Sequence, residues 1–172
     1  SSNDPRNGFV FINSKDTPVT GYMDKNNRYD EANPQGQLPY ARVGGGPVFS
    51  ASMVGANGQN VNVPCFRPPW ATLTAVNVNT GDIAWQVPLG IDDRMPEGKK
   101  NVAAAGSGGP IVTAGGLVFI TATNDRKFRA FDAKTGKELW SAPLDLNSTG
   151  VPMSYMGKNG KQYVAVTVAN GT

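Results

Sequence analysis

The chain of 172 residues contains no histidine and a single cysteine, Cys65. The lack of histidine excludes Ser-His-Asp and Cys-His catalysis, imidazole metal ligands and haem attachment through a C-x-x-C-H motif from this segment. One cysteine can form neither an internal disulfide nor a thiolate cluster for zinc. We expect Cys65 to be a buried, small apolar residue.

Charged residues are also scarce, at 17% of the chain, and the net charge of +3 is spread along it. A nucleic-acid-binding surface would show clustered basic residues interleaved with aromatics, so we expect no nucleic-acid partner. No apolar run is long enough to cross a bilayer, and no signal peptide opens the chain. The start Ser-Ser-Asn-Asp-Pro is typical of the interior of a longer protein.

What the chain has in abundance is turn-forming residues, with 21 Gly and 13 Pro. This composition is typical of many short strands joined by turns. One strand–turn–strand motif occurs twice at an offset of 55 residues, as Thr74–Leu89 and Arg129–Leu144, with six identities in the same order. A repeat of this kind indicates a β-propeller or a solenoid, and two unrelated hairpins are the alternative.

The residues of the motif explain its shape. Gly81 and Gly136 provide the positive φ of a tight hairpin, and Trp85 and Trp140 follow four residues later. A single four-stranded sheet cannot bury an indole alone, so we expect each ring to pack between neighbouring blades.

The remaining apolar runs place these hairpins in blades. Residues 109–144 are predicted to form one complete blade, with strands near 110–113, 116–122, 127–132 and 138–143. Residues 8–89 are predicted to supply the second, third and fourth strands of the preceding blade, and residues 151–168 half of a further blade. The chain is thus predicted to be all-β, a partial β-propeller of about two and a half four-stranded blades. Open strand edges predict self-association.

An insertion at residues 14–70 interrupts the first blade and is rich in Asn, Gly, Pro and Gln. It leaves the blade on the same end as the loop that holds Asp125. Long loops in compact domains are often functional, so we favour a lid over that end, with a passive surface excursion as the alternative.

Three motifs give the chain a resemblance to a known family. They are the run Pro64–Trp70, the two copies of the Trp motif, and the run Gly108–Ile120. Together they resemble the pyrroloquinoline quinone (PQQ)-dependent quinoprotein dehydrogenases, and within them the membrane-type glucose dehydrogenase branch. The resemblance covers nearly the whole chain and is weakest over residues 14–60.

The resemblance implies that residues 1–172 are the C-terminal part of an eight-bladed propeller holding PQQ and a calcium ion. It implies oxidation of an alcohol or sugar, transfer of electrons to a quinone or cytochrome acceptor, and a periplasmic or periplasm-facing location. The catalytic aspartate and the calcium ligands of the family lie mainly in earlier blades, so this segment is expected to hold no catalytic residue and no metal ligand, and to be inactive alone. The alternative is a non-catalytic propeller that acts as a scaffold in the bacterial envelope.

Two positions match cofactor-site residues of the family, Asn13 and Asp125. The alternatives are an ordinary cap at a strand end for Asn13, and an Asx turn or an ion pair with Arg126 or Lys127 for Asp125. Trp70 is expected to be a core residue, with the cofactor face as the alternative. The chain departs from the family at Gly171, where close relatives have histidine.

Overall fold

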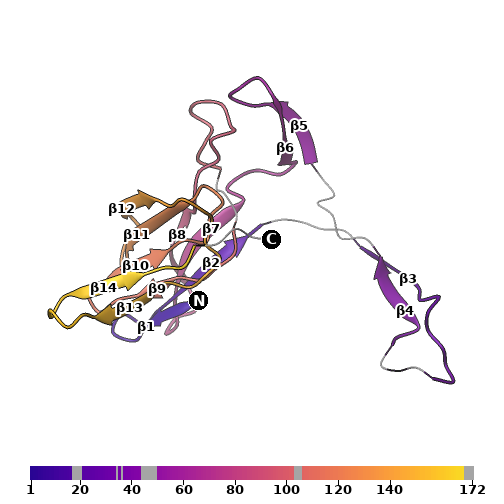
Figure 1. Cartoon of the computed structure of the whole chain (residues 1–172), viewed down its shortest axis with the longest axis horizontal. Helices are drawn as coiled ribbons and strands as arrows, with labels where there is room; N and C mark the ends of the chain where they lie inside the picture. Colours follow the sequence, from indigo (N-terminus) through magenta and orange to yellow (C-terminus); the bar gives the residue numbers. More distant parts are fainter. Residues whose placement is uncertain (17–20, 34, 36, 44–49, 103–105, 169–172) are drawn as a thin grey trace.

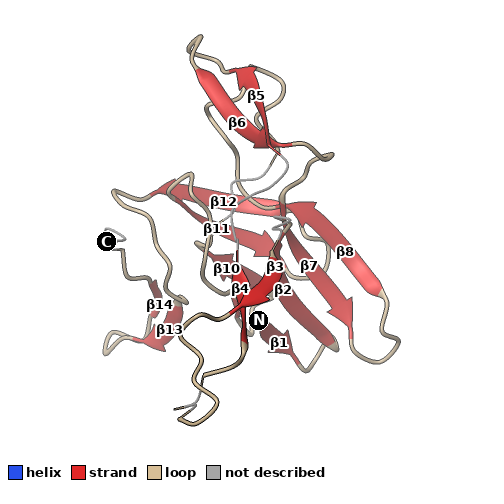
Figure 2. Cartoon of the chain, turned by 90° about the vertical axis from the view of Figure 1, so that its right-hand side faces the viewer, coloured by secondary structure: helices blue, strands red, loops and turns tan. Residues whose placement is uncertain are grey.

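The computed structural model describes residues 1–16, 21–33, 35, 37–43, 50–102 and 106–168. Every regular element within these ranges is a β-strand (Figure 2). No helix in the described part of the chain has the length and apolar character of a membrane span. The strands are β1 (Ser2–Asp4), β2 (Phe9–Lys15), β3 (Tyr22–Lys25), β4 (Tyr40–Val43), β5 (Ser50–Val54), β6 (Asn60–Pro64), β7 (Ala71–Asn77), β8 (Ile83–Pro88), β9 (Ile111–Val112), β10 (Leu117–Ile120), β11 (Lys127–Asp132), β12 (Glu138–Pro143), β13 (Met153–Met156) and β14 (Gln162–Ala165).

Two antiparallel four-stranded sheets form the body of the molecule. The first has the order β1-β2-β7-β8, and the second has the order β12-β11-β10-β9. The hairpin β13–β14 follows as a separate two-stranded sheet. Two complete blades and half of a third are therefore present, as the sequence predicts. The sequence analysis missed one strand: the first blade does not begin at residue 8, because Ser2–Asp4 pairs with β2. These three polar residues show no apolar alternation, and their strand state depends on pairing with β2.

The core lies between the two sheets and is built by the inward faces of β2, β7, β10 and β11. Phe11, Leu73, Leu89, Ile120 and Phe131 are its largest members, each at most 2% exposed. Burying this apolar surface fixes how the two sheets pack against each other.

Both copies of the Trp motif adopt the same local structure. Gly81 and Gly136 have φ values of +80° and +71°, as the tight turns require. Trp85 pairs with Ala75 and Trp140 pairs with Ala130, and in both hairpins the register shifts one position farther along the inner strand.

Trp85 packs between the two sheets, as predicted. Its Nε1 donates to the carbonyl of Ala133 at 3.1 Å, and its ring lies against Gly136. A β-carbon added to Gly136 would lie 2.5 Å from Cε3 of Trp85. Trp140 contacts Phe128 in its own sheet and is 49% exposed. The prediction that this ring packs between blades is therefore not met in the described residues, which contain no third copy of the Trp motif.

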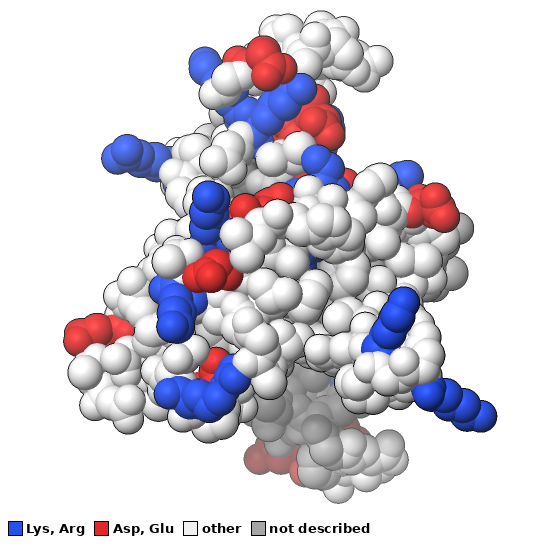
Figure 3. Space-filling model, turned by 90° about the vertical axis from the view of Figure 1, so that its left-hand side faces the viewer, with Lys and Arg blue, Asp and Glu red and all other residues white. Residues whose placement is uncertain are grey.

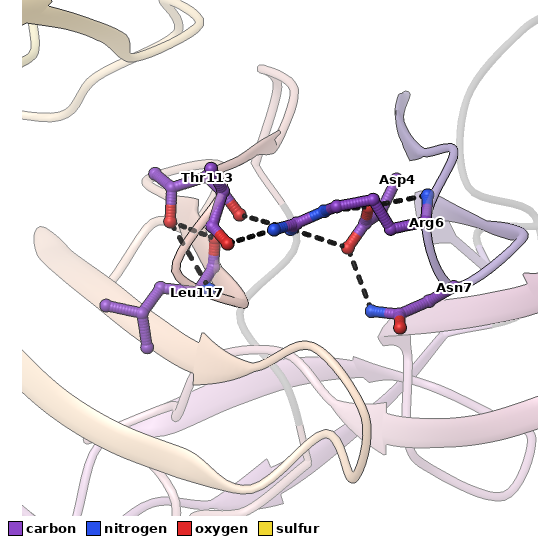
Figure 4. Close-up of polar contacts among 6 residues, drawn as sticks. Asp4, Arg6, Asn7, Thr113 and Leu117 are labelled. Carbon is purple, nitrogen blue, oxygen red and sulfur yellow. Dashed lines mark hydrogen bonds and ion pairs between the residues drawn. The ribbon is translucent and has the colours of Figure 1, made fainter.

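Arg6 lies between β1 and β2, at the opposite end of β2 from the insertion. It joins the first sheet to the second (Figure 4). Its guanidinium donates to the carbonyls of Thr113 and Ala114 in the β9–β10 turn. Asp4, which is 2% exposed, accepts from Arg6 Nε at 3.0 Å and from Asn7 at 2.9 Å. The hydrogen bond from Arg6 holds the pKa of Asp4 below its usual value. The pair therefore presents the guanidinium to the neighbouring turn.

The insertion between β2 and β7 contains two hairpins. The β3–β4 hairpin stands away from the two sheets and is exposed along both strands (Figure 1). The β5–β6 hairpin lies closer, above the end of the sheets (Figures 1 and 2). Only the second hairpin is therefore placed to act as a cover.

Candidate cofactor face

The second strands of the two blades end at the same face, where the long loops between blades cross. Asn13, near the end of β2, donates from Nδ2 to the carbonyl of Gly108 at 3.0 Å. Gly108 belongs to the loop that leads from β8 of the first blade to β9 of the second. Asn13 therefore connects one blade to the loop that enters the next.

The same contact recurs one blade later. Thr121 and Asn13 each lie five residues after a turn glycine, Gly116 and Gly8. The hydroxyl of Thr121 contacts the carbonyl of Gly150, which precedes β13, at 3.4 Å. The position is thus a repeated link between blades. Asn13 differs because a single hydrogen bond leaves its Oδ1 and its second N–H without a partner in the described part of the chain.

Asp125 lies in the β10–β11 loop, and each of its two carboxylate oxygens accepts two hydrogen bonds. Its Oδ1 accepts from the hydroxyl of Thr123 at 2.6 Å and from Arg129 Nη1 at 3.0 Å. Its Oδ2 accepts from the backbone N–H of Ile91 at 2.9 Å and from Arg129 Nη2. The side chain is only 2% exposed. The carboxylate therefore ties the start of the inter-blade loop to the second sheet.

The charge of Asp125 is stabilised by these partners. Burial would raise its pKa, but the hydrogen bonds from Arg129, Thr123 and Ile91 outweigh burial and hold the pKa below the usual value. The ion pair predicted as the alternative, with Arg126 or Lys127, is not the one formed: the partner is Arg129, four residues later on β11. Arg129 is 2% exposed and also contacts Glu138 at 3.2 Å.

The stretch Gly106–Gly109 passes close to the second sheet. A β-carbon on Gly106 would lie 2.8 Å from the backbone of Ala122 and Thr123. Gly108 has a φ of +140°, and a β-carbon there would lie 3.2 Å from the carbonyl of Gly150. Glycine is needed here because the loop backbone lies directly on the neighbouring backbone. The sequence analysis did not identify this role.

The inserted β5–β6 hairpin is held against the inter-blade loop. The N–H of Ala56 donates to the carbonyl of Arg94 at 2.8 Å, and that of Trp70 to the carbonyl of Val102 at 2.8 Å. Val61, Val63, Met95 and Val102 form a second, small apolar cluster there, with Trp70 packed against it. Trp70 is thus only partly buried and packs against this cluster from one side. The prediction that Cys65 is buried is wrong: Cys65 is exposed just after β6.

Two hollows flank this segment. One, of about 420 Å³, is polar and is lined by Lys15, Arg67, Thr72 and Gln86 among others. Gln86 Nε2 donates to Thr74 at 2.9 Å, and Ser14 and Thr72 share a hydrogen bond of 2.8 Å. The other, of about 530 Å³, is mainly apolar and lies beside the second cluster.

The donor set of this face suits part of a planar cofactor that carries carbonyl and carboxylate oxygens. The amide of Asn13 offers one N–H and its oxygen, and Asp125 has no free oxygen to offer. No group of three or more His, Cys, Asp or Glu side chains is placed to hold a metal ion among the residues described. Gly171 lies outside the described residues.

Comparison with known proteins identifies the family to which this fold belongs. Residues 1–164 match the family described as "PQQ: Glucose/ethanol/alcohol dehydrogenase, beta-propeller domain". The chain belongs to this family. Over 114 residues it is 49% identical to the quinate/shikimate dehydrogenase (quinone) of Acinetobacter baylyi, a match that covers 62% of this chain and 14% of the relative. It is 34% identical over 186 residues to the glycerol dehydrogenase large subunit of Gluconobacter oxydans, covering 96% of this chain and 24% of that one.

Solved structures of two dehydrogenases share the fold. The quinohemoprotein alcohol dehydrogenase from Comamonas testosteroni superposes with a TM-score of 0.57 at 23% identity, covering 96% of this chain and 21% of that one. A europium-containing methanol dehydrogenase gives 0.55 at 24% identity, covering 95% and 23%. The prediction of a partial propeller of the quinoprotein type is confirmed. The chain spans about a seventh to a quarter of the length of the curated relatives named above.

Proposed function

We propose that this segment is part of a PQQ-dependent oxidoreductase that oxidises an alcohol or a sugar. The family match over residues 1–164 is the observation that carries the proposal. The relatives support it, because those named above are dehydrogenases of quinate or glycerol, and a glucose dehydrogenase from Acinetobacter calcoaceticus is 36% identical over 111 residues, 62% of this chain and 14% of its own length. A scaffold role has less support, since no named relative above has one.

In this proposal PQQ supplies the redox chemistry, accepting the electrons of the substrate carbon, and the protein orients it. We infer that Asn13 contacts the cofactor through the amide atoms that Gly108 leaves unused. Asp125 then acts as a positioning residue, since it anchors Ile91 at the start of the loop that carries Gly108. A calcium ion held by residues outside this segment would complete the site.

Two further features belong to the same proposal. The electron acceptor is a quinone or a cytochrome, which the printed names of two relatives support: one carries "(quinone)" and a butanol dehydrogenase carries "(cytochrome c)". We place the protein in the periplasm or on the periplasmic side of a membrane, as the family resemblance suggests. Separation of periplasmic and cytoplasmic fractions of the source cells tests this location.

The activity test uses the full-length parent protein. The cofactor-free protein is reconstituted with PQQ and calcium, and dye-linked oxidation is measured with alcohols, aldoses and cyclic polyol acids such as quinate. We expect activity that requires PQQ and is lost when a chelator removes the metal. A parent that neither binds PQQ nor oxidises any member of the panel would refute the proposal and favour the scaffold.

The role of Asn13 is tested with Asn13→Thr, which installs the residue that the next blade uses at the same position. Threonine can keep the link to Gly108 and removes the remaining amide atoms. We expect the free energy of unfolding to stay near that of the wild type. PQQ affinity should fall about two- to twelvefold, the loss of one hydrogen bond of about 0.5–1.5 kcal/mol. Unchanged affinity would remove Asn13 from the cofactor site.

A further inference from the structure

The apolar hollow of about 530 Å³ beside the inserted hairpin is a shaped site. Three segments line it and leave it open to solvent: the β5–β6 hairpin, the run 64–70 and the loop 95–102. They are fixed to one another by the second apolar cluster and by backbone hydrogen bonds to Arg94 and Val102. The volume falls in the range of small-molecule sites, about 300–1,000 Å³.

The walls of this site are apolar and polarisable. Met53, Phe66, Trp70 and Met95 provide two aromatic rings and two thioethers. The indole N–H of Trp70 is already donated to the carbonyl of Phe66 at 3.1 Å, so Trp70 offers a ligand only its ring. Aromatic rings and thioethers favour contact with another flat ring.

A few polar side chains also line the hollow. They are Lys99, Asn101 and Cys65. The ammonium of Lys99 has no ion-pair partner within the described ranges, whereas the neighbouring Lys100 lies 3.1 Å from the carboxylate of Glu97. An ammonium and an amide at the edge of an apolar slot can donate to an oxygen on the rim of a flat ligand.

We propose that this hollow binds a planar ring compound with carbonyl oxygens, the chemistry of a quinone head group. The ring lies against the aromatic and thioether wall, and one carbonyl oxygen accepts from Lys99 or Asn101. A sugar does not match these walls, because most of its hydroxyls would lack hydrogen-bond partners. Neither Asn13 nor Gly108 belongs to the lining of this hollow.

The assignment of this ring compound as the electron acceptor rests on the proposed function. As acceptor, the quinone takes up two electrons and two protons and leaves as the hydroquinone. The reduced cofactor of the proposed reaction is the electron donor. Binding itself depends only on the hollow and is tested without cofactor or turnover.

The binding test uses the lone cysteine of the segment as a reporter. The full-length parent, free of PQQ, is treated with a small alkylating reagent, and modification of the peptide that contains Cys65 is followed by mass spectrometry. The probe is a benzoquinone whose four ring positions carry methyl or methoxy groups, so that thiols cannot add to it. We expect saturable protection of Cys65, by at least fivefold in rate.

Two variant pairs locate the protection. Met53→Trp fills the hollow and should abolish it, whereas Val54→Trp, on the exposed face of the same strand, should leave it intact. Lys99→Met should weaken binding of the probe about tenfold, the loss of one charge-assisted hydrogen bond, and Lys100→Met should not. The Lys99 variant changes an exposed side chain, so it stays informative if Met53→Trp fails to fold.

Absence of protection, or equal protection in both members of each pair, would overturn the proposal. The acceptor role has a separate readout in the active parent. Lys99→Met should raise the KM for the quinone probe and leave oxidation with an artificial dye unchanged. Protection without this change in KM would keep the binding site and refute its role as the acceptor site. A parent that binds the probe but lacks dehydrogenase activity would refute the proposed function alone.

Discussion

Gly136→Ala is expected to destabilise the protein by about 2–5 kcal/mol. Two costs combine. The residue has a φ of +71°, and an alanine held in the left-handed region costs about 1–2 kcal/mol. The new β-carbon would also lie 2.5 Å from Cε3 and 2.7 Å from Cδ2 of Trp85. Forcing such a contact in a packed region costs about 1–3 kcal/mol.

A control in the same blade separates the two costs. Gly116 has a φ of +80°, and a β-carbon there would meet no heavy atom within 4 Å. Gly116→Ala therefore carries only the backbone cost of about 1–2 kcal/mol. The difference between the two variants measures the contact between Trp85 and the turn of the next blade.

The assay is urea denaturation of the parent protein. Circular dichroism follows the transition, and the midpoint of the transition is compared between variants. The two glycine variants are compared in the wild type and in a Trp85→Leu background, which removes the indole. In that background Gly136→Ala should cost no more than Gly116→Ala, because the clash is gone. If the excess cost of Gly136→Ala is absent in the wild type, or persists without the indole, the packing argument is wrong.

Three further predictions address the links between blades. Arg6→Ala should lower the midpoint of urea denaturation. Arg6→Lys should recover little of the lost stability, because one ammonium cannot donate to Asp4 and to the Ala114 carbonyl in the same forked geometry. Equal midpoints for wild type and Arg6→Ala would contradict this. Because the folded pKa of Asp125 is lowered, its stabilisation is complete above the unfolded value of about 3.9 and is lost as the pH falls through the folded value. Asp125→Asn should thus flatten the acid side of the stability–pH curve, and a curve with unchanged slope would count against the ion pair. Gly106→Ala should cost about 1–3 kcal/mol, since its β-carbon would meet the Ala122 backbone at 2.8 Å; the midpoint of denaturation measures this, and a neutral variant would show that the loop can move.

Much of the propeller could be predicted from the sequence because its repeat is local. The Thr-Gly turn and the Trp that follows specify a hairpin within sixteen residues, and the second copy at Arg129–Leu144 shows that the unit recurs. Ser2–Asp4 was missed because its strand state comes from pairing with β2 and not from its own composition. The hairpins of the insertion were missed too, although Val61 and Val63 on β6 alternate with polar residues as a half-buried strand does.

The candidate site was harder to predict, because its contacts join residues far apart in the chain. Asn13 and Asp125 were found by resemblance, but their partners Gly108 and Ile91 lie 95 and 34 residues away. One signal was available and was not used. Arg129 stands in the middle of the strand Lys127–Asp132, between Phe128 and Ala130, and a guanidinium buried there requires a carboxylate partner.

The repeated link between blades suggests how a cofactor position can arise in such a fold. The second blade makes the link with the hydroxyl of Thr121. This hydroxyl has one proton to donate, and Ser148 and the carbonyl of Gly150 are its partners. The first blade makes the equivalent link with Asn13, a longer side chain that needs only one of its two N–H groups to do so. Both positions thus form a hydrogen bond between blades. Only Asn13 has a further N–H and an oxygen that this hydrogen bond does not use. Both positions lie five residues after a turn glycine, Asn13 near the end of β2 and Thr121 just after β10. The difference between the two side chains therefore separates the chemistry from the fold. This is why threonine is the informative replacement for Asn13: it restores the repeat and takes away only what the repeat does not need.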